Sequence, residues 1–529
     1  MSNCWNGVKR GGGSSLSSTG EICAPGFPAI VAAPSDRAGW PIAGEAGVSR
    51  RRVLAQAAGM AGAGVLLPGW LRAGSAAAGE APAGEAATVF PPGFVWGVST
   101  SSYQIEGAAQ ADGRAPSIWD TFTHTPGKVV NSDSGDIACD HYHRYLEDVA
   151  LMARGGMQAY RFSVSWSRVL PAGRGPVNSR GLDFYDRLVD ALLQKNVAPW
   201  LCLYHWDLPQ ALQDQGGWRN RATAEAFRDY ALVMAGRLGD RVRHWIMLNE
   251  PSVVALFGHG LGEHAPGLRG RESWAAAIHH QNLAQGLGLA ALREVARPEW
   301  RLGTVLSVQP IRPSADSPAH RDAATLFDAV WNRSCLDPLF HGRYPEALMA
   351  DLAPWIKPGD LEDIRQPVDF LGLNYYSRLY QQPWAEGLFG TGFGPTPAGI
   401  PQTGMPWPNE PDGLVEQLHQ LRTDYGNPPV YVTENGAAYH DWIGPEGKAE
   451  DGERIAFLRA HLAAAHQALA EGANLKGWFV WTFLDNFEWG LGYSKHFGLV
   501  AVDRTTLKRT PKASYYWYRD VARSNRLRT

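Results

Sequence analysis

The segments HWIMLNEP at residues 244–251 and PVYVTENG at residues 429–436 decide the fold of this chain. Each is a short apolar run that turns polar at its C-terminal end, where Glu250 and Glu434 stand beside asparagines. Continuous apolar runs of this length are typical of strands that are covered on both faces of a parallel sheet. If the two segments belong to one sheet, the same pattern should recur on either side of them.

The pattern recurs to give eight runs, and amphipathic stretches of helical period such as 182–194, 222–238 and 454–469 separate several of them. The runs cover residues 94–102, 159–166, 198–206, 244–251, 301–308, 369–376, 429–436 and 475–485. Eight βα units close a barrel, so we predict an α/β fold with a single (β/α)8 TIM barrel over residues 88–522. An open doubly wound sheet would need a glycine-rich phosphate loop after a strand, and neither GxGxxG nor GxxxxGK[ST] follows a strand here.

The polar residues at the strand ends predict a functional site. In a β/α barrel the C-terminal ends of all strands converge on one mouth, and active sites are built there. Barrel closure therefore brings Glu250 and Glu434 to one cleft. A pair of carboxyl groups is what glycoside hydrolysis requires, because one group protonates the leaving oxygen and the other attacks the anomeric carbon or activates water.

Composition points to a small neutral substrate. Lys and Arg total 49 against 52 Asp and Glu, which leaves a formal charge of -3 and no basic excess for nucleic acid or anionic lipid. The 21 tryptophans fill a large core, and those at strand ends are suited to stacking on sugar rings. The five cysteines show no metal-ligand or disulfide spacing.

Several motifs in the correct order resemble glycoside hydrolase family 1, the β-glucosidase family, over nearly all of residues 88–522. The run FVWGVSTSSYQIE at 94–106 is similar to the family's N-terminal signature, LNEP at 248–251 to its acid/base motif, and VTENG at 432–436 to its nucleophile motif. The resemblance implies a retaining β-glucosidase that works in two steps through a covalent intermediate. Glu434 would be the nucleophile, and Glu250 would act first as acid and then as base.

The resemblance also implies roles for the surrounding residues. Arg161 and Tyr376 would hold Glu434 in its ionised, attacking orientation, and the ionised Glu434 should raise the pKa of Glu250. Trp407 resembles the family's platform for the leaving-group sugar. The residues implied in substrate binding are Gln104, His205, Asn249, Asn374, Tyr376, Trp407, Trp481, Glu488 and Trp489.

Two departures and two exclusions follow from the same resemblance. Ser334 and Cys335 stand where the family usually has two aromatic residues, so either the leaving-group pocket is wider or Trp331 fills the space. His496 stands where Arg is commoner. Relatives that act on 6-phosphorylated sugars replace the carboxylate at the Glu488 position, because it would repel the phosphate, whereas this chain keeps it. The thioglucosidase branch lacks the acid at the Glu250 position, which is also present here.

Other functions stay open. The same residues could serve a β-galactosidase, a β-fucosidase or a transglycosylase, and a non-catalytic exported sugar-binding protein could keep the fold. A metal-dependent barrel enzyme is disfavoured, because Asp140, His141 and His143 read as helix-start and packing residues rather than ligands. We expect no metal and no cofactor, since hydrolysis needs only two carboxyl groups and water. The oligomeric state is not predicted.

The N-terminal residues predict export. SRRRVL at 49–54 is followed by a weakly apolar Gly/Ala-rich run to Leu71 and by alanines at 76–78, which is typical of a twin-arginine signal peptide over residues 48–78. Residues 1–47 are predicted to be a disordered extension or an incorrectly assigned start. We therefore expect a periplasmic or extracellular protein without stable membrane association after export, because the apolar run is too short to span a bilayer stably.

Overall fold

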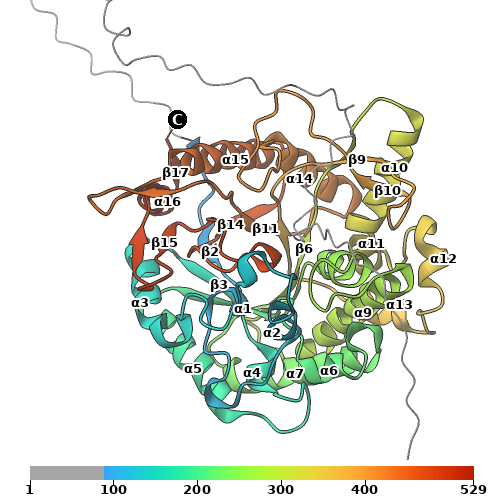
Figure 1. Cartoon of the computed structure of the whole chain (residues 1–529), viewed down its shortest axis with the longest axis horizontal. Helices are drawn as coiled ribbons and strands as arrows, with labels where there is room; N and C mark the ends of the chain where they lie inside the picture. Colours follow the sequence, from blue (N-terminus) through green and yellow to red (C-terminus); the bar gives the residue numbers. More distant parts are fainter. Residues whose placement is uncertain (1–87, 529) are drawn as a thin grey trace, which may run out of the picture.

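The computed structural model describes residues 88–528, and the predicted extension and signal peptide lie outside the described residues. Eight parallel strands form a closed barrel, which confirms the predicted TIM barrel (Figure 1). The barrel strands are β2 (Val95–Ser99), β3 (Ala159–Ser163), β4 (Ala198–Tyr204), β5 (His244–Asn249), β6 (Arg301–Ser307), β8 (Phe370–Asn374), β11 (Val430–Asn435) and β14 (Leu475–Trp481). Each of them lies within one of the eight predicted runs. The barrel closes where β14 pairs with β2, with Gly477 opposite Val95.

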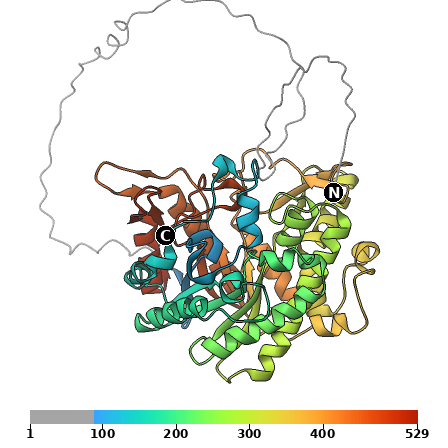
Figure 2. The ribbon, with the colours of Figure 1, turned by 60° about the horizontal axis from the view of Figure 1, so that its bottom comes forward.

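Helices surround the barrel, and α7 and α9 pack against each other on its outside (Figures 1 and 2). Helix α5 shows why these segments are helical, because its buried residues Leu182, Tyr185, Leu188 and Leu192 recur at the spacing of one helix face. The larger helices are α3 (His141–Arg154), α5 (Ser179–Gln194), α7 (Ala222–Leu238), α9 (Arg271–Val295), α10 (Pro318–Asp328), α11 (Ser334–His341), α14 (Asp412–Asp424), α15 (Gly452–Ala470) and α16 (Ala513–Ser524).

Shorter elements connect and cap the barrel. The short helices are α1 (Ser102–Ile105), α2 (Ile118–Thr123), α4 (Trp166–Val169), α6 (Gln210–Gln213), α8 (Pro251–Val253), α12 (Met349–Leu352) and α13 (Asp360–Ile364). The remaining strand pairs are β1 (Thr88–Val89) with β17 (Arg526–Leu527), β12 (Trp442–Ile443) with β13 (Ala449–Glu450), and β15 (Val500–Val502) with β16 (Arg509–Pro511). The pairing of β1 with β17 joins the two ends of the described chain.

Large side chains fill the barrel interior and give the mouth a rigid floor. Trp200 packs against Phe370 and Phe479, with ring centroids 5.3 and 5.0 Å away. A Cβ atom on Gly97 would lie 2.4 Å from the ring of Phe479, so glycine is needed at this position to admit the ring. The barrel is therefore a packed core rather than a pore, and substrate can reach it only at its mouth.

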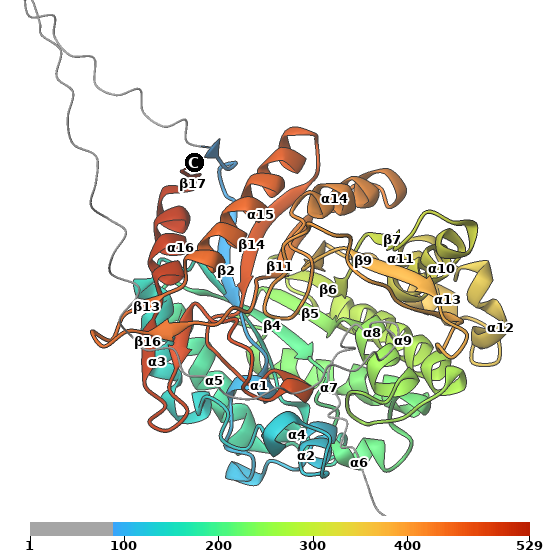
Figure 3. The same cartoon turned by 45° about the horizontal axis from the view of Figure 1, so that its top comes forward.

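A small sheet outside the barrel was not predicted from the sequence. It consists of β7 (Ile311–Pro313), β9 (Leu379–Pro383) and β10 (Thr391–Phe393), in the order β10-β9-β7, and α10 packs on it (Figure 3). Strands β7 and β9 follow barrel strands β6 and β8 in the chain, so the sheet rises from the C-terminal ends of the barrel strands. It forms one wall of the cavity described below.

Two further features bear on the sequence predictions. Cys139, Cys202 and Cys335, the cysteines of the described part of the chain, are buried and free, as the lack of paired spacing indicated. Within residues 88–528, no helix is both long and apolar enough to cross a membrane.

Candidate active site

A cavity of about 340 Å³ opens at the C-terminal ends of the barrel strands. Eight of the predicted site residues line it: His205, Glu250, Tyr376, Trp407, Glu434, Trp481, Glu488 and Trp489. The other four, Gln104, Arg161, Asn249 and Asn374, are fully buried. Arg161, Asn249 and Asn374 hydrogen-bond to residues that line the cavity, and Gln104 donates to the carbonyl of Phe487, which precedes Glu488. The structure therefore brings all twelve residues together at one mouth.

Glu434, near the end of β11, is held by one donor on β3 and another in the loop after β8. Arg161 of β3 donates from Nη1 to its Oε1 at 2.6 Å, and the hydroxyl of Tyr376 donates to its Oε2 at 2.7 Å. Arg161 is fully buried, so the guanidinium acts in an environment where water does not screen it. Both contacts favour the ionised carboxylate and fix its orientation.

Glu250 follows β5 and has a different environment. Its backbone lies in the left-handed region, with φ of 52°, immediately before Pro251 begins α8. Its Oε1 accepts a hydrogen bond of 2.8 Å from Nδ2 of Asn374, which is a neutral donor. The side chain that bonds Glu250 therefore supplies no positive charge of the kind that Arg161 supplies to Glu434.

This difference in partners separates the two carboxyl groups electrostatically. Burial, together with the negative charge of Glu434, raises the pKa of Glu250 to about 8. Burial also raises the pKa of Glu434, but Arg161 and Tyr376 oppose that shift by favouring its ionised form. The pair therefore loses its first proton at Glu434, while Glu250 keeps its proton near neutral pH.

Asn249 links the two carboxyl groups to His205. Its Oδ1 accepts hydrogen bonds from Nη2 of Arg161 at 2.5 Å and from Nδ2 of Asn374 at 3.1 Å, and its Nδ2 lies 3.1 Å from Nε2 of His205. Burial and the charge of Arg161 hold the pKa of His205 well below its usual value, so the imidazole is neutral. The network fixes the side chains on one side of the cavity.

Trp481, the last residue of β14, and Trp489, in the segment that follows it, also line the cavity. Trp489 packs between Trp119 and Trp206, with ring centroids 4.5 Å from each. Trp481 lies beside the imidazole of His205, with centroids 5.7 Å apart and planes 21° apart. These rings give the cavity a flat apolar surface of the kind that stacks on a sugar ring.

Three buried polar atoms of the cavity have no hydrogen-bond partner among the described residues: Nδ1 of His205, Nε1 of Trp331 and Oε2 of Glu488. A buried polar atom without a hydrogen bond costs about 1–3 kcal/mol, so such atoms indicate a missing ligand or solvent. All three residues line the cavity. A polyhydroxylated molecule could satisfy all three atoms, because each hydroxyl can donate and accept.

The outer part of the cavity is lined by aromatic rings. Trp407 lies beside Tyr376 with ring centroids 5.2 Å apart, and Trp331 and Phe393 line the cavity as well. Ser334 and Cys335 are buried in α11 and do not line it. Of the two possibilities that the sequence left open for this region, the structure favours Trp331 as the residue that fills the space.

Several cavity residues were missed in the sequence. Gln309 directly follows the fifth run, so the rule that polar residues at strand ends face the mouth could have found it. It donates to the carbonyl of Asn374 at 3.0 Å and receives a bond from the backbone N–H of Tyr376 at 3.3 Å. Trp206 also lines the cavity, and its indole donates to the carbonyl of Asn249 at 3.1 Å. Both residues stabilise the segments that carry the predicted site.

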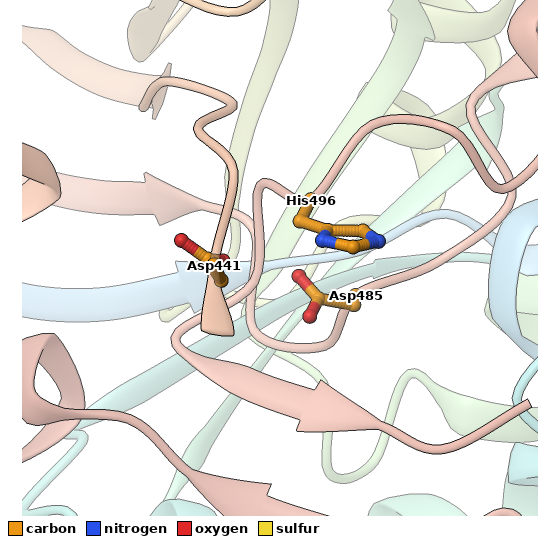
Figure 4. Close-up of side chains that lie close together, drawn as sticks. All are labelled: Asp441, Asp485 and His496. Carbon is orange, nitrogen blue, oxygen red and sulfur yellow. The ribbon is translucent and has the colours of Figure 1, made fainter. Parts of the chain in front are cut away.

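The one group of potential metal ligands found in residues 88–528 consists of Asp441, Asp485 and His496, which lie together in Figure 4. Lys512, which is fully buried, contacts both carboxylates, and Arg454 contacts Asp441. These two cations already neutralise the carboxylates and would repel a divalent ion. The two carboxylates therefore belong to an ion-pair network that joins α15 and the residue before α16 to the segments after β11 and β14.

The residues Asp140, His141 and His143 do not form a common site either. His141 is buried and lies 2.8 Å from Asp148, whereas His143 is exposed and lies 2.5 Å from Asp140. They begin and pack helix α3, in agreement with their interpretation from the sequence.

Comparisons with known proteins agree on one family. Residues 86–527 match the model of "Glycosyl hydrolase family 1". The chain is 49% identical over 448 residues to thermostable β-glucosidase B of Thermobispora bispora, a match that covers 83% of this chain and 92% of the relative. It is 44% identical over 457 residues to a bifunctional β-D-glucosidase/β-D-fucosidase of Bifidobacterium breve, which covers 82% and 97%.

A solved structure gives the same result at the level of the fold. β-Glucosidase of Thermotoga maritima in complex with deoxynojirimycin superimposes with a TM-score of 0.79 at 44% sequence identity. The superposition covers 83% of this chain and 99% of that structure.

Proposed function

This chain belongs to glycosyl hydrolase family 1 and is a retaining β-glucosidase, and from that premise we propose that Glu434 is its nucleophile and Glu250 its acid/base. The observation that carries the assignment is the difference in partners. Glu434 bonds to a guanidinium and a phenol, whereas Glu250 bonds to an amide. The first environment favours an attacking carboxylate and the second a proton donor.

In the proposed first step, Oε1 or Oε2 of Glu434 attacks the anomeric carbon while Glu250 transfers its proton to the glycosidic oxygen. The carbon–oxygen bond to the leaving group breaks, and a glycosyl ester with Glu434 forms. The negative charge of Glu434 then disappears, so the pKa of Glu250 falls and it can act as a base. In the second step Glu250 takes a proton from water, which attacks the same carbon and releases the sugar and the Glu434 carboxylate.

The cavity supports a terminal glucosyl unit as the group that is transferred. We propose that His205 and Glu488 bond its hydroxyls through their unpaired atoms, together with Gln104, Asn249 and Trp489. Trp481 would stack on the ring. Asn374 would act through Glu250 and Asn249, to both of which it donates hydrogen bonds.

We propose that the leaving group occupies the outer, aromatic part of the cavity, with Trp407 as its platform. Aromatic rings of this kind suit a second sugar or an aryl group as the leaving group. A sugar hydroxyl bound there could also replace water in the second step, so transglycosylation uses the same site.

A second candidate substrate is a β-fucoside. The Bifidobacterium breve relative is described as acting on both glucosides and fucosides, and Glu488 has an unpaired oxygen that could bond an equatorial or an axial hydroxyl. Comparison of kcat/KM for p-nitrophenyl β-glucoside, β-fucoside and β-galactoside tests this. We expect the glucoside to be cleaved, and inactivity on all three substrates would contradict the proposed glycosidase function.

The proposed roles predict a bell-shaped pH profile. Glu250 must carry a proton in the first step, so kcat/KM should fall as the pH rises through its pKa of about 8. Glu434 must be ionised, so kcat/KM should also fall as the pH decreases through its pKa, which burial raises above the usual value. The measurement is kcat/KM for p-nitrophenyl β-glucoside against pH. A profile that stays flat through the pKa of Glu250 would contradict its role as the acid.

We also propose that the enzyme is exported through the twin-arginine route to the periplasm or the medium. The support is the sequence SRRRVL before a weakly apolar segment. Replacement of Arg50, Arg51 and Arg52 by lysine keeps the charge but removes the paired arginines. We expect β-glucosidase activity to move from the periplasm and medium into the cytosol of a bacterial host that has this route, and an unchanged distribution would contradict the proposal.

A further inference from the structure

Asp207 is a buried carboxyl group that the proposed mechanism does not use. It is fully buried, and it follows His205 and Trp206 at the end of β4. Trp206 has a φ of 80°, a conformation that side-chain-bearing residues rarely adopt and that persists only when the surrounding structure imposes it. The turn that presents His205 to the cavity is therefore strained, and it needs an anchor.

One anchor is a hydrogen bond that Asp207 accepts from the first residue of α1. Ser102 donates from Oγ to Oδ2 of Asp207 at 2.8 Å. The same serine receives a hydrogen bond of 3.1 Å from Oγ of Ser163, and its backbone N–H donates to that Oγ at 2.7 Å. Because Ser163 ends β3, these three buried residues connect β3, the end of β4 and α1.

Helix α1 in turn holds the segment that carries Glu488. Gln104 donates from Nε2 to the carbonyl of Phe487 at 2.8 Å, and the backbone N–H of Phe487 donates to the carbonyl of Gln104 at 3.2 Å. Phe487 directly precedes Glu488. Hydrogen bonds thus connect Asp207, in the turn that follows His205, through α1 to the segment that carries Glu488.

We propose that Asp207 is a positioning residue for recognition of the terminal sugar: through Ser102 it fixes the separation of His205, Gln104 and Glu488. This inference rests on the sugar-binding roles proposed above for these three residues. Asp207 does not line the cavity, and we assign it no contact with the sugar: it acts through these three residues. In a closely fitted site a misplacement of about 1 Å can cost on the order of 100-fold in rate.

The state of Asp207 suggests a conservative replacement. Burial raises its pKa to about 8, so the neutral acid predominates near pH 7. Asparagine has nearly the same shape as the neutral acid and keeps an oxygen that can accept the hydrogen bond of Ser102. Alanine removes the acceptor of the hydrogen bond from Ser102.

The test compares hydroxyl recognition in Asp207→Ala and Asp207→Asn. The substrates are p-nitrophenyl β-glucoside and its 2-, 3-, 4- and 6-deoxy analogues. The variants Gln104→Ala and His205→Ala identify the hydroxyls that these side chains bond. Each variant should lose less kcat/KM relative to wild type on the analogue that lacks the hydroxyl bonded by the replaced side chain. Asp360→Ala is a matched control, since Asp360 is a buried carboxyl bonded to Arg221 and His279 away from the cavity.

For Asp207→Ala we expect kcat/KM on the parent glucoside to fall by about 10- to 100-fold. The loss should shrink on the same analogues as it does for His205→Ala and Gln104→Ala, and Asp207→Asn should restore most of the activity. Asp360→Ala should lower thermal stability without any preference among the analogues.

Three results would overturn the inference. An equal loss on all four analogues would assign Asp207 a general structural role. An asparagine variant as impaired as alanine would exclude the hydrogen bond to Ser102 as the link. If the losses in kcat/KM of Gln104→Ala and His205→Ala are the same on every analogue, their sugar-binding roles are rejected, and the inference about Asp207 is rejected with them. If those losses shrink on particular analogues but the loss of Asp207→Ala does not, only the inference about Asp207 is rejected.

Discussion

Replacement of Glu434 by glycine is expected to lower kcat on p-nitrophenyl β-glucoside by a factor on the order of 10⁵, about 7 kcal/mol in activation free energy. The variant lacks the group that would form the glycosyl ester. It also leaves the guanidinium of Arg161 and the hydroxyl of Tyr376 without the carboxylate to which both donate. The loss should therefore be in kcat for every leaving group, including the most activated.

Azide distinguishes a lost nucleophile from a damaged fold. The glycine variant leaves a space beside Arg161, and a small anion that enters it can attack the anomeric carbon directly. We expect azide to restore turnover and to give the α-glucosyl azide, identified by NMR. Wild-type enzyme in the same azide concentration is the control and should form no α-azide. A glycine variant with nearly normal activity, or one that azide does not rescue although it is folded, would contradict the assignment of Glu434.

Replacement of Glu250 by alanine should have the second largest effect, and its size should depend on the leaving group. General acid catalysis contributes about 10²- to 10⁴-fold, and it matters most when the leaving oxygen is basic. We expect a loss in kcat/KM of that order for cellobiose and a much smaller one for 2,4-dinitrophenyl β-glucoside, whose leaving group needs no proton. Stopped-flow and steady-state kinetics on the two substrates measure the difference.

The same variant provides its own controls. Its fall in kcat/KM at alkaline pH should disappear with 2,4-dinitrophenyl β-glucoside, because the group that titrates is gone. The second step lacks its base, so the glycosyl enzyme should accumulate, and azide should release it as the β-glucosyl azide. Equal losses on both substrates would show that Glu250 is not the acid.

The barrel could be predicted from the sequence because each strand has a local signature. Buried strands of a parallel sheet are short and apolar on both faces, and their ends become polar only at the mouth. The segments around Glu250 and Glu434 carry both signals, so the strands and their order follow without any knowledge of contacts. The side chains at these ends then meet because the barrel closes.

The sheet of β7, β9 and β10 could not be predicted in this way. Its strands have three to five residues, and β7 pairs with β9 across more than sixty residues of sequence. Pairing over such a distance depends on tertiary packing against α10 rather than on local pattern. Consequently the wall that holds Phe393 emerges only from the structure, and the structure was also needed to choose between a wider pocket and a space filled by Trp331.

Asp207 illustrates a different limit. It belongs to the polar end of β4, so the sequence places it near the mouth. Its hydrogen bond to Ser102, however, joins residues 105 positions apart, and its complete burial separates it from substrate. A strand-end rule predicts which residues reach the mouth, but it does not predict which of them face the ligand and which support their neighbours.

The central claim is a two-step mechanism with retention of configuration at the anomeric carbon. The most direct test is NMR of the glucose that wild-type enzyme releases from p-nitrophenyl β-glucoside, followed from the first seconds before mutarotation. The account predicts β-glucose as the first product, with α-glucose appearing later at the uncatalysed rate. Initial release of α-glucose would mean a single inverting displacement, and it would contradict a covalent intermediate on Glu434.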